Sequence, residues 1–220
     1  GLAAQVPEAI WVPWPETAHG TLNPRALSLL FERLSQASAL LLGPGMGRDR
    51  YTEMVAQDIV REVALPIILD ADALRPRVLE LVPKRKAAMG RVLLTPHMGE
   101  FMRIAKLDQA DYSNQALQAF CRRYAALTVL KAAHTRLCDG ESVWYNICGG
   151  PVLSRGGSGD LLAGLIGGLL AQDAANAELA AARGVLLHGQ AAQLLARQHG
   201  QVLVQTTQLL DYLPQVLRGR

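Results

Sequence analysis

The residues best suited to chemistry lie in a glycine-rich segment at positions 155–160, which reads Arg-Gly-Gly-Ser-Gly-Asp. An apolar stretch of helical character follows at once. Glycines let the backbone fold back and direct several N–H groups at one point, and the positive end of a following helix adds to that field. The segment therefore predicts a phosphate-binding turn. It is not a Walker A loop, because no Gly-Lys-Ser/Thr follows.

Asp160 falls in the first turn of the expected helix and allows two interpretations. A carboxylate at this position can simply stabilise the helix N-terminus by about 0.3–1 kcal/mol. Beside a bound phosphate it can instead act as a general base that takes the proton from an attacking hydroxyl. The spacing alone leaves both interpretations open.

A second candidate segment, Thr-Pro-His-Met-Gly-Glu, follows an expected strand at residues 95–100. One interpretation is a helix-capping arrangement with an incidental histidine. The other places His97 against a substrate and lets Glu100 help to hold hydrated Mg²⁺ near phosphates.

Other polar or glycine-rich positions also follow expected strands. Residues 43–47, Gly-Pro-Gly-Met-Gly, are either a tight turn or a place where backbone approaches a ligand, and they lack the Gly-x-Gly-x-x-Gly spacing of dinucleotide sites. Asp70 and Asp72 offer two carboxylates, of which capping easily explains one. Lys131 is either solvated or contributes charge to a nucleotide. His188 is interpreted as a packed helix histidine.

The composition excludes several classes of protein. Half of the 220 residues are hydrophobic, which is enough for a sizeable core and excludes intrinsic disorder. No uncharged apolar run reaches the roughly 18–20 residues of a membrane span. A net charge of +3 with 5% aromatic residues does not favour nucleic-acid binding. The three cysteines form no Cys-x-x-Cys pair, which favours reduced thiols and a cytoplasmic location.

Short apolar runs alternate with longer amphipathic stretches along the whole chain. Strands are expected at residues 39–42, 66–69, 92–94 and 128–131, a hairpin at 136–138 and 142–146, and helices at 51–63, 99–104, 113–127, 160–172, 174–199 and 207–217. The alternation predicts a single domain over residues 1–220, with a mostly parallel sheet covered by helices on both faces. In such sheets ligands bind beyond the carboxyl ends of the strands, where the unusual residues fall.

Seven segments occur in an order and spacing that resemble one known family. They are GPGMG, LDADAL, LLTPHMGEF, TVLKAA, the Asn-x-x-Gly-Gly at 146–150, GGSGDLLAGLIGGLLAQ and the helix containing LLHG. Together they resemble the ADP-dependent NAD(P)H-hydrate dehydratases of the ribokinase-like superfamily, over nearly the whole chain from Pro7. The resemblance implies an α/β fold, namely a ribokinase-like three-layer αβα sandwich with a mostly parallel central sheet.

The resemblance also implies a reaction. Members of the family repair NADH or NADPH whose nicotinamide ring has become hydrated. ADP, or ATP in some relatives, phosphorylates the ring hydroxyl of the S form of NAD(P)H hydrate, and elimination of phosphate then restores the reduced cofactor. AMP and phosphate are released. The expected partners are therefore the two small-molecule substrates together with Mg²⁺, with no nucleic acid and no membrane.

Carried over position by position, the resemblance assigns each candidate residue a role. Asp160 would be the catalytic base and contact the hydrate, with Gly156, Gly157, Ser158 and Gly159 as the anion hole. Gly45 and His97 would also contact the hydrate. Lys131, Ala132, Ala133, His134, Thr135 and Gly159 would contact the adenine nucleotide, and Glu100 would support Mg²⁺ indirectly.

The chain departs from the family pattern at three places. Ala132 stands where glycine is usual, and Ser158 stands where threonine is usual but keeps the hydroxyl. Some fifty or more residues that usually precede this point, including a first strand and helix, have no counterpart here. We expect an unpaired sheet edge and an exposed apolar face as a result. The chain is then a fragment or an N-terminally shortened relative that forms a homo-oligomer, with a tetramer expected.

Two other functions share the same residues. A small-molecule kinase of the superfamily would use Asp160 and the glycine turn but would release a stable phosphorylated product. A non-catalytic nucleotide-binding relative would bind ADP without turnover.

Overall fold

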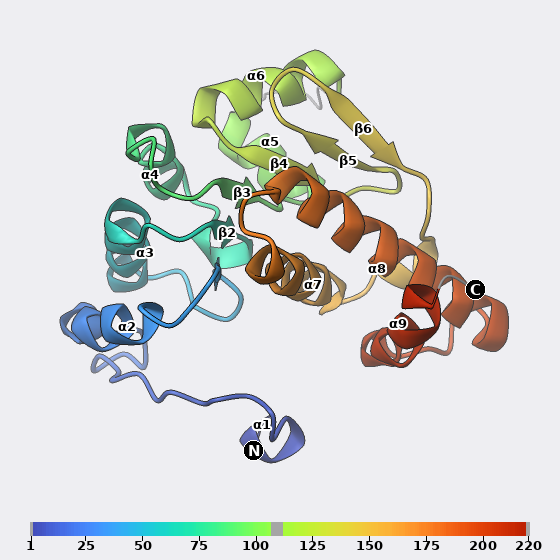
Figure 1. Ribbon diagram of the computed structural model, residues 1–220, viewed down its shortest axis with the longest axis horizontal. Coiled ribbons are helices and arrows are strands. Elements are labelled where there is room, and N and C mark those ends of the chain that lie inside the picture. The colour runs from blue at the N-terminus through green and yellow to red at the C-terminus, as the bar shows by residue number, and fades with distance from the viewer. Residues whose placement is uncertain (1, 107–111, 219–220) are drawn as a thin grey trace.

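A six-stranded sheet forms the centre of the computed structural model, which describes residues 2–106 and 112–218 (Figure 1). Its strands lie in chain order: β1 (Leu40–Leu42), β2 (Ile67–Leu69), β3 (Val92–Leu94), β4 (Leu127–Leu130), β5 (Thr135–Cys138) and β6 (Val143–Asn146). The first four strands pair in parallel, and β5 and β6 form an antiparallel hairpin beside β4. The predicted mostly parallel sheet and the predicted hairpin are both confirmed.

Successive side chains of the inner strands enter two separate cores. Ile67 and Leu69 of β2 point to one face and Ile68 points to the other, and all three are fully buried. This double burial explains why the inner strands are continuous apolar runs rather than alternating ones. The two cores require helices on both faces of the sheet.

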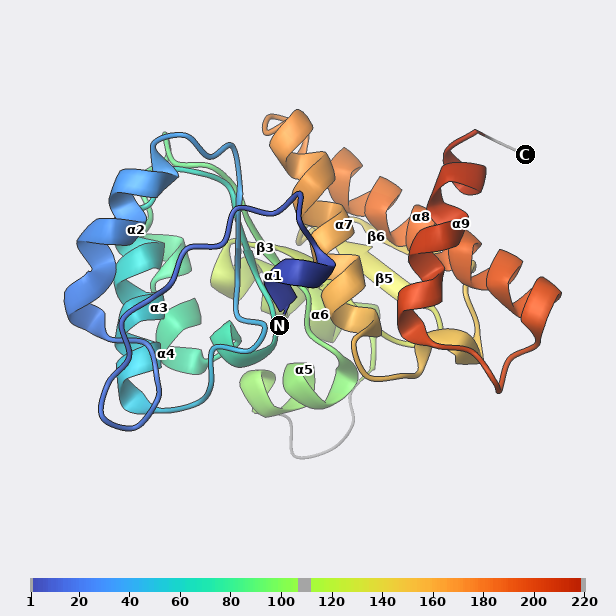
Figure 2. The same cartoon turned by 90° about the horizontal axis from the view of Figure 1, so that it is seen from below.

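Helices cover both faces of the sheet, as Figure 2 shows from a second side. One layer contains α2 (Leu27–Leu34), α3 (Arg50–Glu62), α4 (Pro76–Leu79), α5 (Met98–Ala105) and α6 (Asn114–Tyr124). The other contains α7 (Ser158–Gln172) and α8 (Ala177–His199), with α9 (Leu209–Leu217) packed on α8. The predicted three-layer αβα sandwich is therefore confirmed.

Short helical segments complete the chain. They are α1 (Leu2–Gln5) and the 3₁₀ turns η1 (Pro24–Ala26), η2 (Ala71–Ala73), η3 (Val82–Lys84), η4 (Pro151–Leu153) and η5 (Thr206–Gln208). Helix α2 and these short segments were not predicted from the sequence.

The expected helix at residues 113–127 was too long. Helix α6 ends at Tyr124, because Ala125 adopts a left-handed conformation with φ of 48°. Leu127 then begins β4, where it is fully buried between β3 and β5. A leucine is compatible with a helix or a strand on local grounds, so the packing of the sheet decides that Leu127 belongs to the strand.

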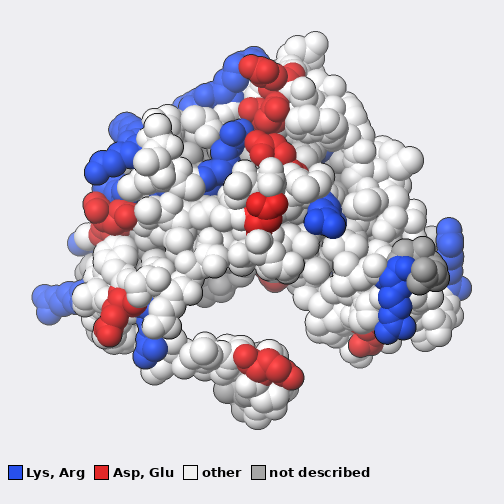
Figure 3. Space-filling model, viewed as in Figure 1, with Lys and Arg blue, Asp and Glu red and all other residues white. Residues whose placement is uncertain are grey.

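The β1 side of the sheet carries exposed apolar surface, as expected. Within the described residues β1 pairs with β2 alone, and an apolar cavity of about 380 Å³ lies beside it, lined in part by Trp14, Leu22 and Leu30. Figure 3 shows an open space between the N-terminal segment and the rest of the molecule, bordered mostly by uncharged residues. Ile10 in that segment is 89% exposed.

No helix among the described residues is long and apolar enough to cross a bilayer.

The contact between α7 and α8 gives a matched pair of glycine substitutions. A Cβ on Gly184 would lie 2.6 Å from Cγ1 of Ile166, whereas a Cβ on Gly164 would meet nothing within 4 Å. We expect Gly184→Ala to lower the free energy of unfolding by about 1–3 kcal/mol through overpacking. Gly164→Ala should raise it by about 0.5–1 kcal/mol, because alanine is the better helix former. Urea unfolding of both variants measures the two effects, and equal signs would contradict the assigned packing.

Candidate functional site

Polar side chains from three neighbouring strand ends meet at the carboxyl edge of the sheet. Asp70 follows β2, Thr95 follows β3 and Lys131 follows β4. Lys131 Nζ and Thr95 Oγ1 each donate a hydrogen bond of 2.8 Å to Asp70 Oδ1. Asp70 is only 1% exposed, so its charge depends on these partners. Lys131 is thus held in a buried ion pair and is not a solvated surface lysine.

His97 is fixed beside this ion pair. The Lys131 N–H donates to the Pro96 carbonyl at 2.8 Å, and His97 and Lys131 form an isolated parallel bridge. His97 Nδ1 accepts hydrogen bonds from the Gly99 and Glu100 N–H groups, and Glu100 Oε2 accepts one from the His97 N–H at 2.9 Å. The helix is therefore capped, as one of the two interpretations held, but the histidine is not incidental to the cap, because its ring is the acceptor. Because Nδ1 is the acceptor, the neutral ring carries its proton on Nε2.

The glycine turn ends where α7 begins. Gly157 is the N-cap with φ of 82°, a left-handed value that favours glycine, and α7 starts at Ser158. Asp160 is the third residue of α7 and is exposed. A Cβ on Gly159 would lie 3.0 Å from Lys131 Nζ, so the lysine lies against the first turn of α7. The positive helix end and the ammonium group therefore act on the same small volume.

A second polar contact lies under the same turn. Ser158 is 3% exposed and its Oγ lies 3.3 Å from Nε2 of His188, which is 5% exposed in α8. Burial lowers the pKa of His188 to about 4; hydrogen bonding with the Ser158 backbone opposes this shift, and the charge of Lys131 adds to it. The imidazole is therefore neutral at neutral pH. The interpretation of His188 as a packed histidine is confirmed, but the ring also faces the candidate site.

The segment after α8 supports the turn from outside. Arg155 donates hydrogen bonds to the Gln201 and Val202 carbonyls at 2.8 and 2.7 Å. Thr206 Oγ1 donates to the Gly156 carbonyl at 2.9 Å. The turn is thus tied to residues about 50 positions away, which keeps its N–H groups in one arrangement.

These elements surround a cavity of about 630 Å³, a size typical of small-molecule sites. Of the residues predicted from sequence, His97, Lys131, Ala132, Ala133, Thr135, Ser158 and Gly159 line it. The cavity is also lined by residues that were given no site role from the sequence: Cys148, Gly150, Pro151, Leu153, Ser154, Arg155, Leu162 and His188. Most of these are apolar or small and carry no chemical signature. The signals that could have indicated some of them were the glycine-rich segment that begins at Arg155, the Asn-x-x-Gly-Gly segment and the LLHG segment.

The remaining predicted residues do not line the cavity. Gly156, Gly157 and Asp160 adjoin it in the same turn, and His134 is exposed next to lining residues. Glu100 is buried in the α5 cap. Gly45 lies in a separate loop after β1.

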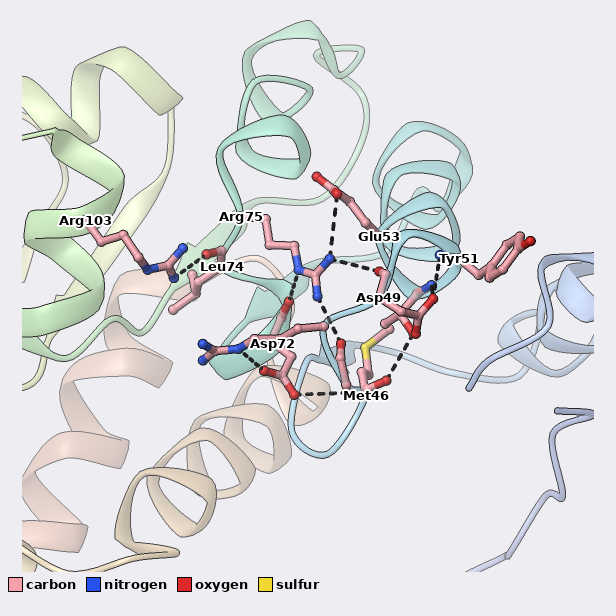
Figure 4. A network of polar contacts seen from close by, with 11 residues as sticks. Met46, Asp49, Tyr51, Glu53, Asp72, Leu74, Arg75 and Arg103 are labelled. Atoms are coloured by element: carbon pink, nitrogen blue, oxygen red, sulfur yellow. Dashed lines mark hydrogen bonds and ion pairs between the residues drawn. The ribbon is translucent and has the colours of Figure 1, made fainter. Parts of the chain in front are cut away.

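Figure 4 shows the polar network that holds this loop. Arg75 donates to the carbonyls of Gly47, Asp49 and Asp72. Asp72 accepts from the Gly47 N–H at 3.0 Å and pairs with Arg48 at 2.7 Å. Asp72 therefore joins the loop to η2. Of the two carboxylates that follow β2, Asp70 is paired with Lys131 and Asp72 has this structural role.

The described residues include no group of three or more His, Cys, Asp or Glu side chains that could hold a metal ion.

The buried ion pair can be tested by removing one partner. Asp70→Ala leaves the Lys131 ammonium without its carboxylate, and we expect the free energy of unfolding to fall by about 3–5 kcal/mol. Asp58→Ala is the matched control, because it breaks the exposed pair with Arg61 and should cost less than about 1 kcal/mol. Chemical denaturation measures both. Similar losses in the two variants would contradict the assigned burial.

The low pKa of His188 predicts a specific loss of stability in acid. The unfolded chain takes up a proton near the ordinary value of 6.5, whereas the native chain does so only near 4. As the pH falls through this window the native state loses about 3 kcal/mol relative to the unfolded state. His188→Gln lacks this contribution. Denaturation of both proteins near pH 7.5 and near pH 4.5 measures it, and parallel losses would refute the assignment.

Comparison with known proteins identifies the family. The family model described as NAD(P)H-hydrate dehydratase matches residues 3–215. A bifunctional NAD(P)H-hydrate repair enzyme Nnr from Moorella thermoacetica is 36% identical over 99% of this chain, which spans 42% of that protein. An ADP-dependent (S)-NAD(P)H-hydrate dehydratase from Xanthomonas campestris is 32% identical over 99% of this chain and 74% of its own length.

The fold agrees with the sequence comparison. The crystal structure of an ADP/ATP-dependent NAD(P)H-hydrate dehydratase from Bacillus subtilis, co-crystallized with ATP/Mg²⁺, superposes with a TM-score of 0.79 at 26% identity. That alignment covers 99% of this chain and 76% of the other. Since one family model spans nearly all of the residues that build the glycine turn, the strand-end ion pair and the cavity, this chain belongs to the NAD(P)H-hydrate dehydratase family.

Proposed function

We propose that this chain dehydrates the S form of NAD(P)H hydrate at the expense of ADP or ATP. The observation that carries the proposal is the first turn of α7, where Asp160 lies next to a glycine turn and a lysine-bordered cavity. The names of the similar proteins supply the substrate class. The same residue types at this sheet edge suit phosphoryl transfer, because that reaction depends on positioning and charge stabilisation.

The reaction is proposed to begin with transfer of the terminal phosphoryl group. Asp160 accepts the proton of the ring hydroxyl, whose oxygen forms a bond to the terminal phosphorus of the nucleotide. With ADP the leaving group is AMP. The ring carbon–oxygen bond then breaks, phosphate leaves, and loss of a proton from the neighbouring carbon restores the double bond. Phosphorylation is needed because hydroxide is a poor leaving group.

The anion formed during transfer is proposed to lie at the glycine turn. The first N–H groups of a helix lack partners within the helix, and the Ser158 N–H already bonds the Arg155 carbonyl. The N–H groups of Gly159 and Asp160 are thus left to face the phosphoryl group, with Gly156 and Gly157 shaping the turn. Lys131, which follows β4 and lies against Gly159, adds positive charge to the same place.

The nucleotide is proposed to occupy the cavity, against Lys131, Ala132, Ala133, His134, Thr135 and Gly159, with the hydrate on the side of His97 and Gly45. Nε2 of His97 lies 3.5 Å from Glu100 Oε2 on a side chain that is 60% exposed, and its N–H is the donor that we assign to the substrate. Mg²⁺, when bound, would neutralise phosphate charge. Glu100 Oε2 serves the cap, so Oε1 is the atom that would act on the hydrated ion.

Three expectations about the whole protein stay predictions. They are a single domain over residues 1–220, a homo-oligomer such as a tetramer, and a cytoplasmic location. The exposed apolar side chains Ile10, Trp11 and Val12 support association, because large exposed apolar patches mark contact surfaces.

A repair assay with a matched pair of aspartate variants tests the function. The protein is incubated with Mg²⁺, ADP and hydrated NADH, and the recovered near-ultraviolet absorbance of the reduced nicotinamide is followed. Asp160→Asn removes the base, so we expect turnover to fall at least about a hundredfold. Asp173→Asn makes the same change at the opposite end of α7 and should keep activity.

Two results would contradict the proposal. A stable phosphorylated product without recovered NADH would indicate a small-molecule kinase. Nucleotide binding without any turnover would indicate a non-catalytic relative.

A further inference from the structure

We propose that His188 is a positioning residue, which holds Ser158 and thereby sets the conformation of the phosphate-binding turn. The inference rests on the proposed function, because the turn matters only if it binds a transferred phosphoryl group. It assigns a task to a histidine that lies more than one helical turn from either end of α8.

Ser158 occupies the position at which the glycine turn becomes a helix. Its N–H closes the turn on the Arg155 carbonyl at 3.3 Å. The two residues that follow lie in the first turn of α7, where the N–H groups of a helix lack partners within the helix. A rotation at Ser158 would therefore move the donors of Gly159 and Asp160 together. The hydroxyl is buried, so a partner from outside the turn is needed to hold it.

His188 is that partner, and its own position is rigid. It projects from the middle of a 23-residue helix, and Nε2 lies 3.3 Å from Ser158 Oγ. The neighbouring Gly189 packs so closely against the Cys148 carbonyl that a Cβ would lie 2.7 Å from that oxygen. Helix α8 is therefore closely packed against the backbone of Cys148 at this point. The serine is held by a side chain with little freedom to move.

The charges around His188 fit a neutral ring. Lys131 is the charged group that faces it from the sheet, and the low pKa of about 4 agrees with this position. A neutral imidazole carries one donor and one acceptor nitrogen, so Nε2 can bond the hydroxyl in either tautomer. A protonated ring beside Lys131 would add a second buried cation.

A purely space-filling role for His188 makes a different prediction. If only volume matters, His188→Leu should be tolerated as well as His188→Gln. If the hydrogen bond matters, glutamine should function better, because its amide reaches about as far as Nε2 and can bond the hydroxyl. Ser158→Thr keeps the hydroxyl and Ser158→Ala removes it.

The test is a double-mutant cycle on the full chain, read in kcat, in KM for ADP and in the dissociation constant of Mg-ADP from calorimetry. His188→Leu and Ser158→Ala should each lower kcat by about tenfold, the effect of one lost hydrogen bond. The double variant should be no slower than either single one. His188→Gln should retain kcat to within about threefold, because its amide can still bond the hydroxyl. His199→Leu, at the exposed end of α8, is the matched control and should have no effect.

Several outcomes would overturn the inference. Losses that multiply in the double variant would show that the two side chains act independently. Equal activity of His188→Leu and His188→Gln, or a loss of thermal stability without a change in kcat or Mg-ADP affinity, would leave His188 a packing residue. If the wild type binds Mg-ADP without repairing the hydrate, the proposed function fails, and the double-mutant cycle is then evaluated only from the dissociation constants of Mg-ADP. If the wild type shows neither Mg-ADP binding nor turnover, the proposed function and the inference about His188 are both refuted.

Discussion

The buried ion pair between Asp70 and Lys131 is the interaction on which the rest of the site depends. It joins the ends of β2 and β4 across β3, and Thr95 from β3 completes it. A carboxylate that is 1% exposed is costly without compensation, so three strand ends must meet in one register. Position 159 has no side chain, which lets the first turn of α7 lie close to the lysine, since a Cβ there would lie 3.0 Å from Lys131 Nζ.

Two helix N-termini converge on this edge of the sheet, and each uses its first turn differently. In α5 the carboxylate of Glu100 turns back to the His97 N–H and closes the cap. In α7 the N-cap is a left-handed glycine without a side chain, and Asp160 remains exposed. One helix end is therefore closed by its own side chains, whereas the other has no side-chain cap hydrogen bond. This difference agrees with the proposal that the start of α7, and not the start of α5, receives the phosphoryl group.

The glycine turn is held from several parts of the chain. Arg155 and Thr206 link it to the segment between α8 and α9, and His188 contacts it from α8. Transition-state stabilisation requires donors that are already in place, and a glycine-rich turn has little rigidity of its own. The long C-terminal helices therefore supply the rigidity that the turn lacks. The chain spans 42% of the length of the Moorella protein.

Neighbouring residues in the sequence were sufficient to predict the elements that are formed by local interactions. Apolar runs predicted the inner strands to within about a residue, and the glycine turn predicted the start of α7 near Asp160. A cap at the start of α5 was one of the two interpretations of residues 95–100, but the part that the His97 ring plays in it was not foreseen. What failed was Leu127, which is assigned to β4 by neighbours far along the chain.

The sequence by itself determined the fold class, the family resemblance and the residues of the glycine turn, since periodicity and short motifs depend on neighbouring positions. Only the tertiary structure decided that Lys131 is paired with Asp70, that Asp72 holds a loop with Arg48, and that His188 reaches Ser158. These partners lie 24 to 61 residues apart. Contacts at such separations arise from the packing of strands and helices, and no local pattern encodes them.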